Sequence, residues 1–233
     1  MPLKQAVLPL LDDADETVRL TGACNTVVVG ARTGTGRRTG TGSGRGTPRL
    51  LGANTDVDGI VRAVREVSGR QATPVAHVLG GGATAASAVL ALRRLGCPTP
   101  VVHVRDPARA TAVLAVAGRC GSVVDLQPWP TTPALASVLA AADAVVATTP
   151  AGSTAAVADV LPPAVAGTLL DVAYEPWPSA LAARWAAAGG AVAPGSLMLL
   201  HQAAVQVRLM TGREAPLPAM RAALAQVRSE IPT

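Results

Sequence analysis

The sequence predicts an α/β protein whose main sheet is parallel and covered by helices on both faces. Three observations support this prediction. From Pro74 onward, short strands alternate regularly with helical stretches. These strands are continuously apolar, as expected when both faces of a sheet are buried. Of the 233 residues, 49% are hydrophobic and only 15% are charged, which is enough apolar material for a sizeable core and excludes a disordered chain.

The first 70 residues follow a different pattern. A short amphipathic segment covers residues 5–18, and the β-branched run NTVVVG (25–30) predicts a strand. The string RLLGANTD (49–56) predicts its partner strand. Residues 58–68 predict a helix, because their apolar side chains recur on one face. This part of the chain therefore predicts a smaller structural unit that precedes the parallel sheet.

The rest of the chain predicts alternating elements up to its end. Strands are expected at 75–82, 101–104, 122–126, 144–149, 168–174 and 191–193. Helices are expected at 83–95, 107–117, 134–142, 179–188, 196–211 and 217–229. Gly212 and Pro216 separate the last two helices, because glycine ends a helix readily and proline favours the start of another.

The formal net charge of +5 comes from one segment. Residues 31–50 contain five arginines, six glycines and no acidic residue, so the other residues sum to zero. We interpret residues 31–47 as a loop between two strands. Nucleic-acid binding by this loop is an alternative. The complete absence of Phe, with only three Trp and one Tyr in the chain, argues against base stacking, so we expect no nucleic-acid partner.

Other features exclude further classes of protein. The longest apolar stretch, 144–170, is interrupted by prolines and an aspartate, so we expect no membrane span. The first residues do not form an apolar signal region, which indicates a cytoplasmic protein. The three cysteines lack the spacing of metal ligands, so we expect buried reduced thiols and no metal site.

The string VLGGG (78–82) predicts a dinucleotide-binding turn, because it ends a strand and runs into an Ala-rich helix. Gly80 and Gly82 allow a tight turn and close approach of a pyrophosphate, and the helix beginning at Ala83 offers free N–H groups. The six-residue glycine fingerprint is incomplete, because Ala85 stands where its last glycine would be. A strand before the turn and a helix after it favour dinucleotide binding over a plain tight turn.

The residues after the next strand bear on the choice of cofactor. Asp106 precedes Pro107, which is typical of a helix N-cap followed by proline. We therefore assign Asp106 to capping rather than to a ribose hydroxyl. Arg105 and Arg109 are left to bind a 2′-phosphate, which guanidinium groups grip well. This pattern favours NADP, with NAD as the possible alternative.

Six strings occur in the order and spacing of shikimate dehydrogenases, and this resemblance covers practically the whole chain. They are GACNTVV (22–28), GANTDVDG (52–59), VLGGGATAA (78–86), TTPAG (148–152), DVAYEP (171–176) and GSLMLLHQAAVQ (195–206). The resemblance implies an oxidoreductase that reversibly reduces 3-dehydroshikimate to shikimate with NADPH, in chorismate and aromatic amino acid biosynthesis. It also implies a truncated α/β substrate domain (1–70), a Rossmann-type NADP-binding domain (71–194) and C-terminal helices (195–233) that return to the first domain. A monomer and a homodimer both remain open.

The resemblance further implies a catalytic pair. The string MPLKQAV matches the end of the family's P-x-K motif, so Lys4 is the expected catalytic lysine, and Asp56 of NTD is its expected partner. Ketone reduction needs a proton at the developing alkoxide, and an ammonium oriented by a carboxylate can deliver it. The alternatives are a solvated terminal lysine and an aspartate that only caps a helix.

Other roles follow from the same resemblance. The implied substrate-binding residues are Asn25, Asn54, Tyr174 and Gln202. The implied cofactor-binding residues, besides the two arginines, are Gly80, Gly82, Ala83, Thr149, Gly152, Gly195 and Met198. Tyr174 could instead serve packing alone, and Gln202 could form a polar pair with His201.

Two departures from the family pattern lead to further expectations. The match starts at Met1, inside the P-x-K motif, so we expect roughly 60 upstream residues, the size of two βαβ units, which supply the family's two carboxylate-binding serines. Val104 stands where the family commonly has Asn, and Asp106 replaces a hydroxyl residue, which bears on cofactor preference. The alternatives are an NAD-linked quinate/shikimate dehydrogenase and a non-catalytic nucleotide-binding fragment.

Overall fold

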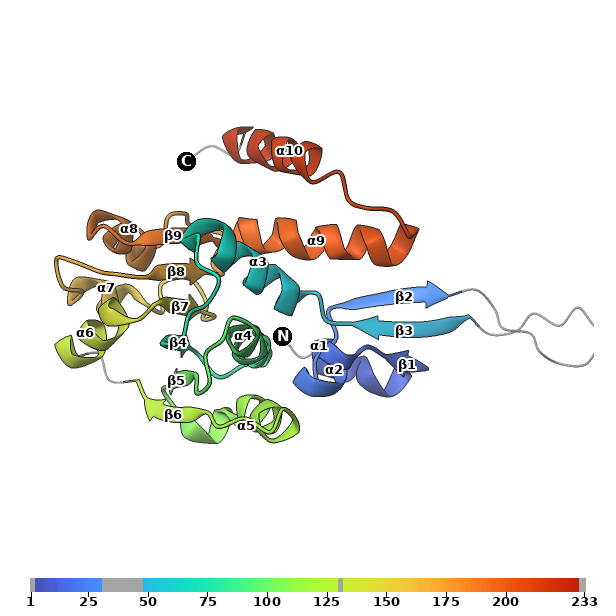
Figure 1. Cartoon of the computed structure of the whole chain (residues 1–233), viewed down its shortest axis with the longest axis horizontal. Helices are drawn as coiled ribbons and strands as arrows, with labels where there is room; N and C mark the ends of the chain where they lie inside the picture. Colours follow the sequence, from blue (N-terminus) through green and yellow to red (C-terminus); the bar gives the residue numbers. More distant parts are fainter. Residues whose placement is uncertain (1–2, 31–47, 130–131, 231–233) are drawn as a thin grey trace, which may run out of the picture.

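The computed structural model describes residues 3–30, 48–129 and 132–230. These residues form two β-sheets with helices around them (Figure 1). The larger sheet has the order β6-β5-β4-β7-β8-β9, and each neighbouring pair is parallel. Its strands are β4 (Ala76–Leu79), β5 (Val101–Val104), β6 (Asp125–Pro128), β7 (Ala144–Ala147), β8 (Thr168–Asp171) and β9 (Ala191–Pro194).

This strand order is that of a Rossmann-type sheet, which confirms the predicted fold class. The chain builds outward from β4 in one direction and then, after β6, outward from β7 in the other. The order therefore reverses between β4 and β7, where the carboxyl ends of the strands leave a crevice for a ligand. Both central strands are buried along their whole length.

Helices cover both faces of the larger sheet, which explains its continuously apolar strands. Val78 packs with residues of α3, α4, α5 and α9, whereas Leu79 packs on the opposite face with residues of α6, α7 and α8, because successive side chains of a strand point in opposite directions. The bounds of these helices are α3 (Asp56–Ser68), α4 (Ala83–Arg94), α5 (Thr111–Arg119), α6 (Pro133–Ala141), α7 (Ala155–Asp159), α8 (Ala180–Ala187) and α9 (Gly195–Thr211).

The smaller sheet is built from the first part of the chain. Its order is β1-β3-β2, with β1 (Asp13–Ala14) parallel to β3 (Arg49–Ala53) and β2 (Thr26–Gly30) antiparallel to it. The predicted pairing of the two strands is thus confirmed, while the Gly/Arg-rich loop 31–47 lies outside the described residues. Three short elements precede and flank this sheet: α1 (Leu3–Ala6), η1 (Leu8–Leu10) and α2 (Glu16–Thr21).

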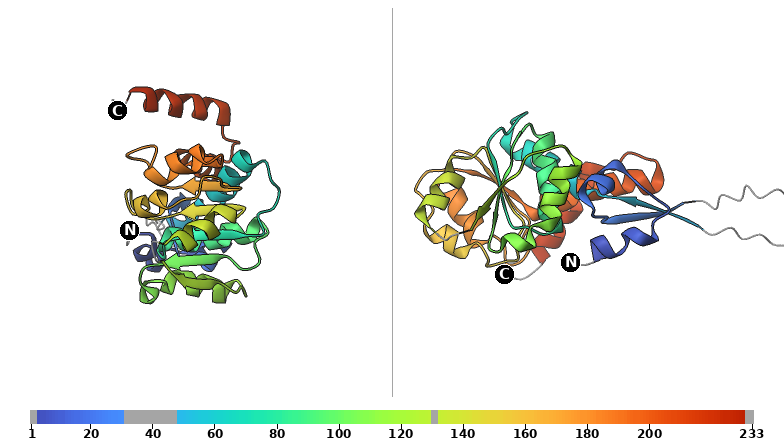
Figure 2. Two further views of the ribbon diagram at one scale, coloured as in Figure 1. Left: turned by 90° about the vertical axis from the view of Figure 1, so that its left-hand side faces the viewer. Right: turned by 90° about the horizontal axis from the view of Figure 1, so that it is seen from below.

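Two long helices connect the sheets. Helix α9 runs from the end of β9 to the smaller sheet, and α3 lies against it (Figures 1 and 2). Gly59 permits this close approach, because a Cβ there would lie 2.8 Å from the carbonyl oxygen of Met198. Helix α10 (Leu217–Glu230) packs on the outer side of α9.

Two buried histidines lie side by side on the larger sheet. His77 of β4 and His103 of β5 stack with ring centroids 5.2 Å apart, and Nδ1 of His77 lies 2.9 Å from Nε2 of His103. One ring donates and the other accepts this hydrogen bond. Burial and, next, the neighbouring His103 lower the pKa of His77 to about 4, and burial also lowers the pKa of His103. Both rings are therefore neutral at pH 7.

Some boundaries differ from the expectation. The predicted helix 107–117 is divided into a 3-10 turn, η2 (Pro107–Arg109), and α5. The Asp106 carboxylate accepts a hydrogen bond from Ala108 N at 3.0 Å, so its predicted capping role is confirmed. Strand β6 lies about three residues beyond the predicted 122–126, because this edge strand is largely exposed and carries no apolar run. The short β1 and α7 have no counterpart among the expected elements.

Three further findings concern the excluded classes of protein. Among the described ranges, no helix is both long and apolar enough to cross a membrane. The same ranges hold no group of three or more His, Cys, Asp or Glu side chains arranged for a metal ion. Cys24 and Cys97 are free and buried, as predicted, and Cys120 is free and partly buried.

Candidate active site

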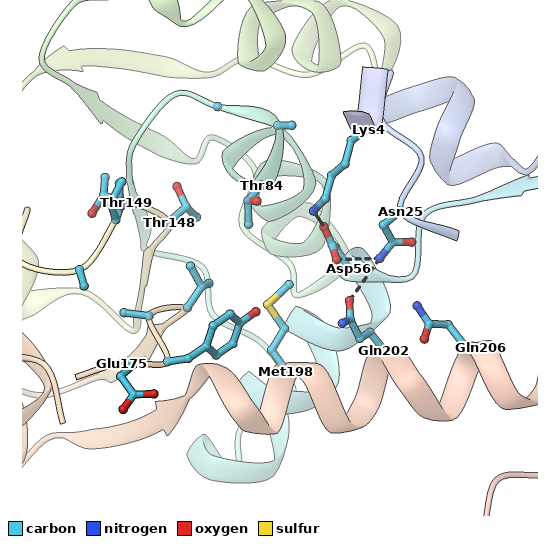
Figure 3. Close-up of a pocket in the computed structure, with 17 residues that line it drawn as sticks. Lys4, Asn25, Asp56, Thr84, Thr148, Thr149, Glu175, Met198, Gln202 and Gln206 are labelled. Atoms are coloured by element: carbon cyan, nitrogen blue, oxygen red, sulfur yellow. Dashed lines mark hydrogen bonds and ion pairs between the residues drawn. The ribbon is translucent and has the colours of Figure 1, made fainter. Parts of the chain in front are cut away.

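A cavity of about 700 Å³ lies between the two sheets, at the carboxyl ends of β4 and β7 (Figure 3). One wall carries Lys4, Asn25 and Asp56 from the first part of the chain. The opposite wall carries Thr148 and Thr149, which follow β7, and the glycine turn that follows β4. Segments that are far apart in the sequence therefore meet at the switch point of the larger sheet.

Lys4 and Asp56 form an ion pair in this cavity. Nζ of Lys4 donates to Oδ2 of Asp56 at 2.5 Å, and Figure 3 shows the two side chains pointing toward each other. The Asp56 side chain is only 4% exposed, whereas that of Lys4 is 19% exposed. Asp56 is the first residue of α3, where the helix dipole stabilises a carboxylate. The structure therefore brings together the two residues predicted as the catalytic pair.

Amide side chains continue the polar wall beside this pair. The Asn25 amide donates to Oδ1 of Asp56 at 2.8 Å and to Oε1 of Gln202 at 3.2 Å. Gln206, one turn further along α9, donates to Oγ1 of Thr26 at 3.0 Å. Amides both donate and accept hydrogen bonds, so this wall is suited to a ligand with several hydroxyl groups.

Tyr174 and Met198 line the cavity between the polar wall and the glycine turn. Tyr174 is 53% exposed, so packing alone does not explain its position. Burial of its hydroxyl and the negative charge of Asp56 raise the pKa of Tyr174, which keeps the phenol protonated at neutral pH. Met198 supplies an apolar surface one helical turn before Gln202.

The glycine turn fits the close approach of a ligand. Gly80 has φ +118°, and a Cβ there would lie 2.6 Å from Oγ1 of Thr148, so a side chain is excluded. At Gly82, in contrast, a Cβ would meet no atom within 4 Å, so the space in front of the turn is open. Gly82 is also the N-cap of α4, whose first N–H groups face the cavity that Ala83 lines.

A second cavity of about 440 Å³ extends the first along the carboxyl edge of the sheet. Gly82, Thr148 and Thr149 line both cavities, so a single elongated ligand can occupy them together. Arg105 and Trp129 line its far end. A guanidinium suits a phosphate and an indole suits a flat aromatic ring, so this end fits the adenosine half of a dinucleotide.

Four of the predicted site residues require comment. Asn54 does not line the cavity: it is 1% exposed, and its amide is engaged with Thr21, Ser87 and the backbone of Asp56. The prediction that it binds substrate is therefore corrected. Gly152 and Gly195 do not line either cavity. Gly195 instead allows α9 to start close to β8, because a Cβ there would lie 2.8 Å from the backbone of Val172. The Arg109 side chain lies outside the described part of the chain.

Several lining residues were not predicted. Trp129 was missed because the strand before it was placed too early, so its position at the carboxyl end of β6 was not apparent. Gln206 was not assigned a ligand, although it follows Gln202 by four residues and Met198 by eight, and that helical spacing was a sufficient signal for a role in the cavity. Thr84 and Glu175 also line the main cavity.

A parallel sheet of this order, a glycine turn at its switch point and an ammonium–carboxylate pair across the same cavity define a dinucleotide-dependent oxidoreductase. Shikimate dehydrogenase (NADP(+)) of Rubrobacter xylanophilus is 35% identical over 232 residues, which cover 96% of this chain and 74% of the relative. The chain therefore belongs to the shikimate dehydrogenase family.

Further comparisons agree with this assignment. A family profile described as Shikimate 5'-dehydrogenase C-terminal domain matches residues 195–225. The crystal structure of Mycobacterium tuberculosis shikimate dehydrogenase is similar with a TM-score of 0.79 and 36% identity, over 97% of this chain and 76% of that one. Quinate dehydrogenase from Corynebacterium glutamicum in complex with NAD has a TM-score of 0.77 and 31% identity, over 97% of this chain and 75% of that one. The family therefore includes members with either cofactor.

Proposed function

We propose that this chain catalyses the reversible NADPH-dependent reduction of 3-dehydroshikimate to shikimate. The observation that carries the proposal is the Lys4–Asp56 pair, which lies across one cavity from the glycine turn. Relatives of more than 30% identity named shikimate dehydrogenase (NADP(+)) support the same reaction. Under this proposal residues 1–70 and 195–233 form the substrate domain, and residues 71–194 form the cofactor domain of a cytoplasmic enzyme.

The proposed chemistry needs one proton and one hydride. When bound, NADPH supplies the hydride that converts the ring ketone to an alcohol. The Lys4 ammonium gives a proton to the carbonyl oxygen as the negative charge develops there, and Asp56 holds the ammonium in place. Because the Lys4 side chain remains 19% exposed, water can restore its proton. In the reverse direction, the neutral amine accepts the proton of the shikimate hydroxyl.

The other residues of the cavity select and orient the substrate. Asn25, Gln202 and Gln206 present amides to the ring hydroxyls, and Tyr174 offers a protonated phenol. Met198 supplies an apolar surface to the site. Positioning of this kind holds the bound reacting groups in a geometry close to that of the transition state, which accounts for much of an enzyme's rate enhancement.

We infer that NADP is the preferred cofactor, with NAD as the alternative. Arg105 lines the adenosine end of the second cavity, while Asp106 is occupied by capping the turn at Pro107. An arginine favours a 2′-phosphate, whereas a free carboxylate at this place would favour the 2′-hydroxyl of NAD. The structural likeness to an NAD-bound quinate dehydrogenase keeps the NAD-linked reaction as the second candidate.

The test is a steady-state assay of the purified chain with each substrate and cofactor pair. We expect oxidation of NADPH, followed by its absorbance, that depends on 3-dehydroshikimate, and the reverse reaction with shikimate and NADP⁺. Faster turnover of quinate with NAD⁺ would favour the second candidate. NADPH binding in a fluorescence titration without any substrate-dependent turnover would overturn both and indicate a nucleotide-binding fragment.

A further inference from the structure

A buried hydrogen-bonded chain joins the two walls of the active site. It starts at Asn54, the residue two positions before Asp56. Oδ1 of Asn54 accepts a hydrogen bond from the backbone N–H of Asp56 at 3.1 Å. The two hydrogens of its amide go to Oγ1 of Thr21 at 2.9 Å and to Oγ of Ser87 at 3.0 Å. With three partners and 1% exposure, the Asn54 side chain has a defined position and orientation.

Ser87 connects these hydrogen bonds to the cofactor-binding region. It lies in α4, five residues after Gly82, and is fully buried. Its hydroxyl accepts from Asn54 and donates to the carbonyl oxygen of Ala83 at 3.3 Å. Ala83 is the first residue of α4 and lines the main cavity. These hydrogen bonds therefore run from the cavity wall beside the glycine turn, through the buried Ser87 and Asn54 side chains, to the backbone of Asp56.

The position of these hydrogen bonds matters for hydride transfer. Lys4 comes from α1, and Asp56 begins α3, which also packs on the larger sheet, so the separation of this pair from the glycine turn depends on how the first part of the chain and α3 contact α4. Other contacts at this boundary include the hydrogen bond from Nε of Arg119 to the carbonyl oxygen of Leu20 at 2.7 Å, which is exposed to water. A buried link holds its geometry more firmly than an exposed one, because water does not compete for its partners.

We propose that Asn54 and Ser87 are positioning residues that hold the Lys4–Asp56 pair at a fixed place relative to the cofactor-binding turn. The inference rests on the proposed function, because it assigns these residues a role in that reaction. Neither residue touches the cavity, so both act only through the groups that they hold. Loss of the link allows Asp56, and with it Lys4, to shift away from the reacting carbonyl. A shift on the order of 1 Å is enough to slow a reaction up to a hundredfold.

The test is Ser87→Ala, which removes the hydroxyl and leaves a residue that favours helices. We expect kcat to fall on the order of tenfold, while KM for both substrates stays within about twofold, since no ligand contact is lost. The matched control is Thr73→Val. Thr73 is also fully buried, but among the described residues its hydroxyl finds no hydrogen-bond partner. This control should leave kcat unchanged, and circular dichroism establishes that both variants are folded.

Two comparisons distinguish positioning from a general structural effect. In a Lys4→Met background, Ser87→Ala should cause no further loss of kcat, because it acts through Lys4. Unchanged kcat in folded Ser87→Ala, or an equal loss in the Lys4→Met background, would overturn the proposal.

A binding experiment separates this proposal from the proposed function. If the unmodified chain shows no turnover, the proposed function fails, but the link still predicts that NADP⁺ tightens the binding of shikimate. We expect about fivefold tightening in the unmodified chain and nearly none in Ser87→Ala. The same tightening in both proteins, or none in the unmodified chain, would overturn the role of the link.

Discussion

The stacked pair of His77 and His103 makes the stability of the larger sheet depend on pH. The pKa of His77 is about 4 in the folded protein, against the ordinary value of 6.5, a difference that corresponds to about 3 kcal/mol. The folded state binds fewer protons than the unfolded state between these two values. The contribution of neutral His77 to the free energy of unfolding is therefore fully present above pH 6.5 and is lost as the pH falls toward 4. From pH 7.5 to pH 5, protonation of unfolded His77 alone removes about 2 kcal/mol.

The assay is urea unfolding of the unmodified chain and of His77→Gln at these two pH values. Tryptophan fluorescence is a suitable signal, because Trp185 is buried on the same face of the sheet as His77 and Leu79. Since both proteins share all other titrating groups, the difference between their pH-dependent losses reports His77 together with its coupling to His103. We expect His77→Gln to lose about 2 kcal/mol less than the unmodified chain. Equal losses in the two proteins would refute this reasoning.

A control uses the remaining histidine of the chain. His201 of α9 is buried, and burial lowers its pKa, but its hydrogen bond to Glu66 at 2.8 Å acts in the opposite direction. His201→Gln should therefore reduce the pH-dependent loss by less than His77→Gln does.

Four further variants test the active site. Lys4→Met should lower kcat by about a hundredfold or more with a modest change in KM, because a general acid is lost; near-normal turnover would remove Lys4 from the mechanism. Arg105→Ala should weaken NADPH binding about tenfold or more and leave NADH binding unchanged, and titrations that show equal weakening of both cofactors would contradict the assignment of the 2′-phosphate. Gly82→Ala should keep the melting temperature and weaken NADPH binding, since its Cβ enters open cavity space, whereas Gly80→Ala should cost on the order of 1–3 kcal/mol of stability because of its positive φ and its contact with Thr148. Equal destabilisation by the two alanines would show that the space in front of Gly82 is not open.

The sequence predicted the fold well where burial was complete. Strands such as β4 and β7 have all residues buried, so their apolar runs marked them clearly. Prediction was less successful at the edges. Strand β6 is mostly exposed and was placed too early, and Trp129 after it was consequently overlooked as part of a cavity.

The candidate site was predicted unevenly for a related reason. The P-x-K and NTD strings identified Lys4 and Asp56, which the structure places 2.5 Å apart. Asn54 belongs to the same NTD string, yet the backbone turns its side chain away from the cavity and into the boundary with α4. A linear motif gives residue types and order, but it does not show which side chains face a ligand. Only the three-dimensional structure, in which Asn54 contacts Ser87, shows that Asn54 faces away from the cavity.

The polar wall of the cavity has a consequence for the order in which the protein folds. Asn25 and Gln202 are 177 residues apart in the sequence, and Gln206 and Thr26 are 180 apart. All the strands of the larger sheet lie between them. During synthesis, Asn25 and Thr26 therefore cannot form these hydrogen bonds until α9 has been made. Because closing so long a loop is costly until the intervening sheet has brought its ends together, we expect the Rossmann-type sheet to form before the polar wall of the cavity is completed.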